Sequence, residues 1–533
     1  MRKGGKVGKT GKSSNTVMTV FLGLLAAQFV SSMSNTIIAN AMPVIVAQIG
    51  GNAVQYTWVV TAGILANTIT TSVIGKLADL FDKKKLFIAS LILFATASIL
   101  SGASQTANQL IASRVLQGIG MGMMITLTTV IMATIVSPRE RGKYNGYMAA
   151  TMAVSTVGGP LIGGLIVDSL GWQWCFWIPV PFVVIVMFVV GHQLKVPTVH
   201  EGKAHVDFLG IALIGAAAAS LLIWISSEGR DFTIGSPISI ALIAIFIVST
   251  ALFIFVESRA TEPLIPLYLF RNRTIVLSLV AFIAQGMAQF SIAVFFGQYF
   301  QYGRSYTPTA SGLMTLPLML TMMAASTIIG RRTTATGYWK RYVMGGLSAM
   351  VIGMLMFWPV TATTSLVYIG VAMAILGGGM GAMNTLMVAI QNLVGLNIMG
   401  VTTSTAMFFR TLAGALGIQL LGRVYQANVN NDIVDQLGSM PTSTGGTGEL
   451  DFAALPDPVE AVVRASYGTE LGMVFLVMAG FALAGLIAVA FIKGTSLRSS
   501  IDLDQVKKIV ADEETIIEGT SLDINDGDES PTR

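Results

Sequence analysis

Two arginine side chains lie far from the ends of long apolar segments, where an unpaired charge is costly. Arg114 falls inside the apolar stretch 108–135, and Arg410 falls inside 399–421. A guanidinium at the centre of a membrane helix costs roughly 2.5–3.5 kcal/mol, so it needs a partner or a water-filled cavity. None of the 27 acidic residues lies deep in an apolar segment. These residues therefore predict an interior of positive potential that binds an anionic group.

The apolar segments also carry amide side chains. Gln117 follows Arg114 by three residues, which is about one helical turn. Gln285 and Gln289 are four residues apart and share one face of an expected helix. They are candidates for orienting a bound molecule, and hydrogen bonding between helices is their alternative role.

The elements that carry these residues must be solvated by lipid. The chain has 533 residues, of which 53% are hydrophobic and 11% charged, against about 25% charged in ordinary soluble proteins. The single cysteine, Cys175, excludes an intramolecular disulfide framework and a cysteine-cluster metal site. Basic residues occur in short runs between apolar segments, which is a topology signal and not a nucleic-acid signal. No catalytic triad, metal-ligand or phosphate-loop pattern is present, so we expect neither an enzyme nor a bound cofactor.

Fourteen segments are long enough to cross a hydrocarbon core of about 30 Å. They span 17–43, 56–78, 86–104, 108–135, 144–167, 172–191, 206–227, 237–256, 275–300, 309–329, 342–360, 364–388, 399–421 and 471–492. With this count, 26 basic residues fall on the side of the N-terminus and four on the other. The positive-inside rule then places both termini in the cytoplasm.

The loop between the second and third segments reads GKLADLFDKKK, residues 75–85. A Lys run at a helix end is also typical of a simple interfacial stop signal. Here the string resembles the signature loop of the major facilitator superfamily through Gly75, Asp79, Lys83 and Lys84. In that family the carboxylate latches a neighbouring helix, and Leu80 and Asp82 depart from the usual pattern.

Two further segments resemble motifs of the same family. The order of Arg114, Gln117 and Gly118 is similar to its fourth-helix motif, and a cavity-lining role for Arg114 is expected. The fifth segment is similar to the antiporter motif of drug exporters. Its residues are Gly159, Pro160, Gly163, Gly164 and Asp168.

The stretch SSMSNTIIANAMPV, residues 31–44, resembles the first-helix motif of the family with one change. Ser34 stands where the family has an acid, and Asn35 and Asn40 add amides. The usual proton carrier is therefore missing from this segment.

The resemblance implies an all-α polytopic membrane protein with 14 transmembrane helices, arranged as two six-helix bundles plus two inserted helices. The domains expected are a basic cytoplasmic tail, a first bundle, two linker helices, a second bundle with an outer loop, and an acidic cytoplasmic tail. Their bounds are 1–16, 17–191, 192–274, 275–492 with the loop at 422–470, and 493–533. We expect a monomer in a bacterial inner membrane, in contact with the lipid bilayer and a small amphipathic substrate, and with no nucleic-acid partner.

The function expected is secondary active export of amphipathic organic anions, such as bile-acid-like steroids or fatty acids, by alternating access. An anion leaving a negative interior gains about 2.3 kcal/mol per 100 mV, so the membrane potential, protons or both can drive it. The alternatives are a multidrug:proton antiporter for lipophilic cations and a lipid or glycolipid flippase. Ser34 in place of the acid favours the anion.

Overall fold

The structure is a computed structural model, and it describes most of the apolar chain. The described residues are 11–50, 53–136, 169–194, 207–227, 233, 235–260, 263–394, 398–438 and 456–494, together with some of those between 144 and 167. All regular secondary structure in these ranges is helical. In lipid this is expected, because a helix satisfies its own backbone hydrogen bonds.

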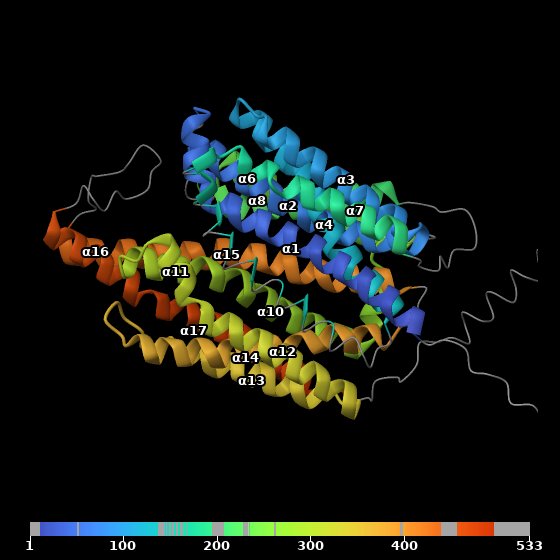
Figure 1. Ribbon diagram of the computed structural model, residues 1–533. Coiled ribbons are helices and arrows are strands. Elements are labelled where there is room, and N and C mark those ends of the chain that lie inside the picture. The colour runs from blue at the N-terminus through green and yellow to red at the C-terminus, as the bar shows by residue number, and fades with distance from the viewer. Residues whose placement is uncertain are drawn as a thin grey trace, which may run out of the picture.

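The helices form a first and a second bundle, coloured blue to green and yellow to red in Figure 1. The first contains α1 (Gly11–Gln48), α2 (Ala53–Leu80), α3 (Lys83–Gly102), α4 (Ala107–Ile135), α6 (Trp174–Trp177) and α7 (Pro179–Gln193). Described residues between 144 and 167 add helical backbone between α4 and α6. The inserted pair is α8 (Phe208–Ser227) and α9 (Pro237–Glu257).

The second bundle begins with the short 3-10 helix η1 (Leu267–Arg271). It continues with α10 (Arg273–Gln298), the π-helical turn η2 (Tyr299–Gly303), α11 (Pro308–Met314), α12 (Leu316–Thr336), α13 (Lys340–Leu355), α14 (Leu366–Gln391), α15 (Met399–Leu437), α16 (Asp457–Thr469) and α17 (Leu471–Ala490). Short polar side chains begin several of these helices. Asn272 accepts from the N–H of Thr274, and Ser365 accepts from that of Val367, which satisfies a free donor of the first turn.

The two bundles repeat the same helix contacts. In the first, α4 packs on α2 and α3, and α7 packs on α1 and α3. In the second, α14 packs on α12 and α13, and α17 packs on α10 and α13. These matching contacts indicate that the two bundles are an internal structural repeat.

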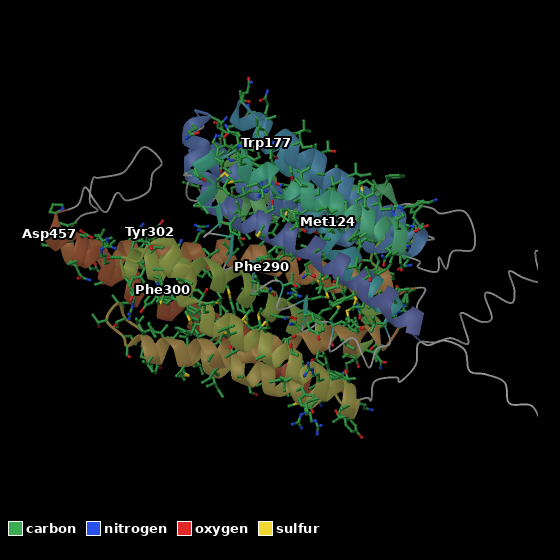
Figure 2. All side chains as sticks on the ribbon, viewed as in Figure 1. Met124, Trp177, Phe290, Phe300, Tyr302 and Asp457 are labelled. Atoms are coloured by element: carbon green, nitrogen blue, oxygen red, sulfur yellow. The ribbon has the colours of Figure 1, made fainter. Side chains whose placement is uncertain are left out.

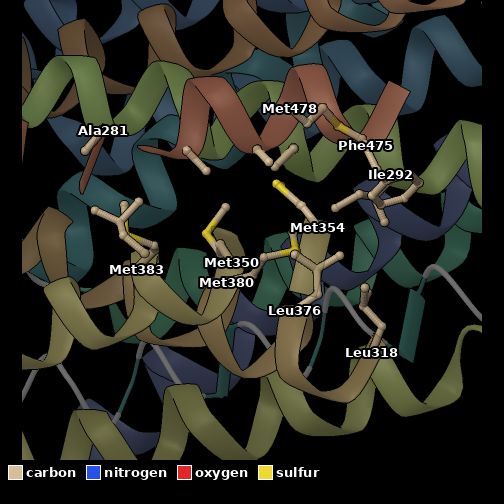
Figure 3. Close-up of a cluster of buried hydrophobic side chains, with 14 of the residues drawn as sticks. Ala281, Ile292, Leu318, Met350, Met354, Leu376, Met380, Met383, Phe475 and Met478 are labelled. Atoms are coloured by element: carbon tan, nitrogen blue, oxygen red, sulfur yellow. The ribbon is translucent and has the colours of Figure 1, made fainter. Parts of the chain in front are cut away.

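Methionine fills much of the core of the second bundle. Met350 and Met354 of α13 lie against Met380 and Met383 of α14, with Met478 of α17 nearby (Figure 3). All five side chains are buried. Methionine has a flexible, unbranched side chain that can fill irregular gaps between helices. These residues therefore help the helices of this bundle to pack closely.

Ten described helical segments are long and apolar enough to cross a membrane. The other four expected spans correspond to α2, α12, α13 and the helical residues between 144 and 167. By length and hydropathy the described residues of these four do not meet the same criteria. The multi-pass helical fold is confirmed, and the count of fourteen stays a prediction.

The segment 422–470 is more regular than the outer loop that we predicted from its composition. α15 continues to Leu437, and Tyr425, Val429 and Ile433 are buried at helical spacing along it. α16 then packs on α15 and on η2. The sequence did not indicate this helical structure, because the buried face of these residues depends on tertiary contacts. The placement of the segment outside the membrane stays a prediction.

Candidate functional site

A cavity of about 130 Å³ lies between the two bundles. The first bundle contributes residues of α1, α2 and α4 together with Met148, and the second contributes residues of α10, α12, α14 and α15. The polar lining residues are Gln28, Ser32, Asn67, Thr71, Thr129, Gln285, Gln289, Asn384, Arg410 and Thr411. Because both bundles supply walls, a molecule held here would contact both of them.

Arg410 is the one charged side chain among the described residues that line this cavity. Its guanidinium donates to Oε1 of Gln289 on α10. Close approach of α10 and α15 positions the pair, because a Cβ at Gly286 would collide with the carbonyl oxygen of Arg410. Three of the predicted site residues, Arg410, Gln285 and Gln289, are therefore brought together. The sequence spacing indicated the shared face of Gln285 and Gln289, and the packing of α10 against α15 adds Arg410.

Gln285 belongs to a chain of amides in the second bundle. Its Nε2 lies 3.5 Å from Oδ1 of Asn384 on α14, whose Nδ2 donates to Oγ of Ser326 at 3.3 Å. The sequence analysis missed Asn384. Only the packing of α14 against α10 and α12 shows that its side chain enters the same network.

The rest of the lining is apolar and soft. It comprises Ile125, Met148, Phe282, Phe290, Met322, Met380, Met387 and Met407. Phe290 is labelled in Figure 2, and its ring also limits the approach of α15, since a Cβ at Gly414 would collide with it. The five methionines that line the cavity with Arg410 have flexible side chains, which can adapt to apolar groups of different shapes.

Arg114 and Gln117 lie away from this cavity, which corrects the expectation that Arg114 lines it. The Arg114 side chain is 3% exposed. Nη1 donates to Oε1 of Gln117 at 2.6 Å, and Nε lies 3.4 Å from the carbonyl oxygen of Val59. Gln117 in turn donates to Oγ of Ser98 at 3.0 Å. The Arg114 side chain packs over Gly63 of α2 on the inside of the first bundle. Through Gln117 and Ser98 it also connects α4 with α3.

The first-helix motif also differs from its expected role. Ser34 is fully buried, and Asn35 is partly buried, but α1 reaches the cavity through Gln28 and Ser32 instead. These two residues are four apart and share a helix face. The sequence analysis missed them because it considered only the residues of the first-helix motif. The side chain of Asn40 lies outside what the structure describes.

Asp79 joins the two bundles at the end that carries the Lys83–Lys85 run. Its Oδ1 accepts from the N–H of Gly400 at 3.0 Å, and its Oδ2 accepts from that of Val401 at 2.8 Å. Both donors belong to the first turn of α15, where the helix dipole favours a negative charge. Asp79 is one residue beyond the apolar segment 56–78, and burial raises its pKa to about 7. This is the latch that the signature loop implied.

The other residues of this loop support the contact. A Cβ at Gly75 would collide with Ser404 of α15, so glycine permits α2 and α15 to touch. Asp82, a departure from the family pattern, caps α3 by accepting from the N–H of Lys84 at 2.8 Å. The Lys83 side chain is buried, and that of Lys84 is partly exposed.

Gly159 and Gly163 pack against α1. A Cβ at Gly159 would collide with Thr36, and one at Gly163 would lie 3.2 Å from the carbonyl oxygen of Ile37. Thr36 Oγ1 donates to the carbonyl oxygen of Ser155 at 3.1 Å across the same contact. The remaining residues predicted for this motif, Pro160, Gly164 and Asp168, lie outside the described residues.

Comparison with known proteins places these features in a family. Residues 24–418 match the family described as Major Facilitator Superfamily. The chain is 32% identical to the multidrug transporter protein MdtP of Bacillus subtilis, over 94% of this chain and 98% of that protein. It is 31% identical to multidrug resistance protein 3 of the same organism, over 82% and 85%.

Solved structures share the fold at low identity. A proton:xylose symporter, XylE, superposes with a TM-score of 0.62 and 11% identity, covering 93% of this chain and 99% of that one. A human organic anion transporter superposes with a TM-score of 0.57 and 16% identity, covering 90% and 99%.

Proposed function

Because this chain belongs to the major facilitator superfamily and is a membrane transporter, we propose that it exports amphipathic organic anions. Its relatives named as multidrug transporters support the export of organic compounds. The preference for anions is carried by one observation, which is that the described residues lining the central cavity include Arg410 and no acidic residue.

The charge of Arg410 favours this choice energetically. At a separation of about 5 Å and an effective dielectric constant near 20, two unit charges interact by about 3 kcal/mol. That interaction attracts a carboxylate or sulfonate and repels a lipophilic cation by the same amount. The methionines and phenylalanines that surround Arg410 then receive the apolar body of the substrate.

The membrane potential supplies enough energy for this transport. Moving one negative charge out of an electrically negative interior gains about 2.3 kcal/mol per 100 mV, which sustains a concentration ratio of roughly fifty. We therefore propose electrogenic export from the cytoplasm of a bacterial cell, through the inner membrane, with both termini on the cytoplasmic side.

Transport by the purified protein in liposomes tests the proposal. The anionic probe is taurocholate, a bile-acid sulfonate that stays ionised at neutral pH, and the cationic probe is ethidium. We expect Arg410→Gln to lower kcat/KM for taurocholate about tenfold to a hundredfold, because a hydrogen bond to a charged group is worth about 1.5–3 kcal/mol. Transport of ethidium should not fall.

The names of the relatives favour a second candidate, a multidrug:proton antiporter that carries cations. Strong ethidium transport by the wild type, with no taurocholate transport, would establish that candidate and contradict anion export. A pH jump at clamped voltage separates the two couplings, since only the antiporter would respond to the proton gradient alone.

A further inference from the structure

The last residue of α9, Glu257, is a buried acid that lies outside the central cavity. Its side chain is 3% exposed. Oε1 accepts from the backbone N–H groups of Leu264 at 3.0 Å and Ile265 at 3.2 Å. Oε2 is buried and has no hydrogen-bond partner within the described part of the chain. An ionised carboxyl group would therefore leave part of its charge unpaired in a site without water, which is costly.

A second acid, Asp207, precedes α8 and lies close enough for its negative charge to act on Glu257. Its Oδ1 accepts from the N–H of Gly210 at 2.8 Å. Its Oδ2 is buried and also has no hydrogen-bond partner among the described residues, and a Cβ at Gly210 would collide with this atom. Because two negative charges repel strongly where water is excluded, we expect one of the two acids to be protonated.

The two helix ends decide which acid holds the proton. Asp207 binds the first turn of α8, where the helix dipole favours a negative charge, and Glu257 ends α9, where the dipole disfavours one. Lys76 of α2 is the cation that acts on Glu257, and its effect is weaker than that of Asp207. The charge therefore belongs on Asp207 and the proton on Glu257.

The loop that Glu257 binds lies against both bundles. Leu264 and Ile265 are buried in one hydrophobic cluster with Phe408 of α15, and Val73 of α2 packs against the same cluster. The helix α8 also contacts both α2 and α15. Separation of the inserted pair from the bundles would open this cluster and give water access to the carboxyl group, so the cost of ionising Glu257 depends on docking.

We propose that Glu257 is a proton-binding site, which is occupied while the inserted pair is docked on the bundles and is emptied when the pair separates from them. The ligand is a proton and not a divalent cation, since such cations take six or more oxygen ligands. Among the described residues, no group of three or more acidic, histidine or cysteine side chains could hold a metal ion. Uptake and release at one end of the molecule carry no proton across the membrane, so the site is compatible with export driven by voltage.

Hydrogen–deuterium exchange of the peptide 263–272 tests this site without any substrate. The full-length protein in detergent carries Asp79→Asn as a background, which removes the titration of Asp79. Glu257→Gln is added to this background, because glutamine keeps an acceptor for the two N–H groups but does not titrate. Asp82→Asn in the same background is the matched control, since that acid caps α3. Protection factors at pH 6 and pH 8 correct for the effect of pH on intrinsic exchange.

We expect protection of this peptide to fall about tenfold from pH 6 to pH 8 in the background protein and in the control, because the docked state binds the proton more tightly. Glu257→Gln should stay as protected at pH 8 as at pH 6. An ordinary glutamate, with a pKa near 4.3, is ionised throughout this range. Protection independent of pH in the background protein would therefore overturn the inference, and so would a fall that persists in Glu257→Gln.

Asp207→Asn provides a second test that does not depend on the folding of Glu257→Gln. Removing the neighbouring negative charge should move the loss of protection to lower pH, because Glu257 then ionises more easily. A transition that stays at the same pH would contradict the interaction of the two acids. None of these measurements involves transport, so their outcome is independent of whether the protein exports anions.

Discussion

Asp79 accepts a hydrogen bond from the backbone N–H of Gly400 at 3.0 Å, although the two residues are 321 positions apart. One belongs to α2 of the first bundle and the other to the first turn of α15 in the second. The bond closes the end of the molecule that carries the Lys83–Lys85 run. We therefore expect a change at this contact to alter the relative position of the bundles, and a change in the central cavity to alter substrate choice.

Replacing Asp79 with Ala should open the contact between α2 and α15. The N–H groups of Gly400 and Val401 lose their acceptor, which costs the closed arrangement about 2 kcal/mol. Hydrogen–deuterium exchange of the peptide 398–406 should increase about thirtyfold. Asp82→Ala is the control, because Asp82 lies in the same loop but caps α3. Equal exchange in the two variants would show that the contact does not depend on Asp79.

The same contact should respond to pH. Burial raises the pKa of the Asp79 carboxyl group to about 7 in the closed contact. When the bundles separate and water reaches this group, its pKa returns toward about 3.9. Because the closed state binds the proton more tightly, the contact is strengthened as pH falls and is weakened as pH rises through about 7. Protection factors of the peptide 398–406 should be higher at pH 6 than at pH 8. Asp79→Asn should remove this difference, and its persistence would assign it to another group.

Arg114 should affect stability and not selectivity. Substitution by Met leaves Gln117 Oε1 without its donor at 2.6 Å, which should destabilise the protein by about 1–3 kcal/mol. Thermal unfolding in detergent would measure the loss. The ratio of taurocholate to ethidium transport should stay at the wild-type value, whereas Arg410→Gln should reduce it. A shift of that ratio in Arg114→Met would place Arg114 on the substrate path after all.

Gly286 should be required for the geometry of Arg410. A Cβ there would collide with the carbonyl oxygen of Arg410 and push α15 away from α10. Gly286→Ala should therefore lower taurocholate transport at least fivefold, although alanine is the better helix former by about 1 kcal/mol. Gly297→Ala is the control on the same helix, since its nearest neighbour is the flexible end of Gln301 at 3.8 Å. Similar activity of the two variants would argue against a positioning role.

The sequence by itself determined the helical membrane fold, and it indicated that Asp79 contacts a neighbouring helix. Apolar segments of membrane length have few alternatives to helices, because lipid offers no hydrogen bonds to an open backbone. The resemblance of the loop GKLADLFDKKK to the signature loop of the family implied that Asp79 latches a neighbouring helix. The absence of deep carboxylates was equally visible from the printed letters.

Only the tertiary structure decided which of the two arginines within apolar helices faces the cavity. Arg114 and Arg410 look alike in sequence, since each is a single cation within an apolar helix. The rotation of α4 turns Arg114 toward Gln117 and Val59 inside the first bundle, while α15 turns Arg410 toward Gln289 and the space between the bundles. Helical spacing fixes which residues share a face, but which face meets the cavity depends on how the helices pack against one another. For the same reason, only the structure shows that Gln28 and Asn67 line the cavity, because both bundles form its walls.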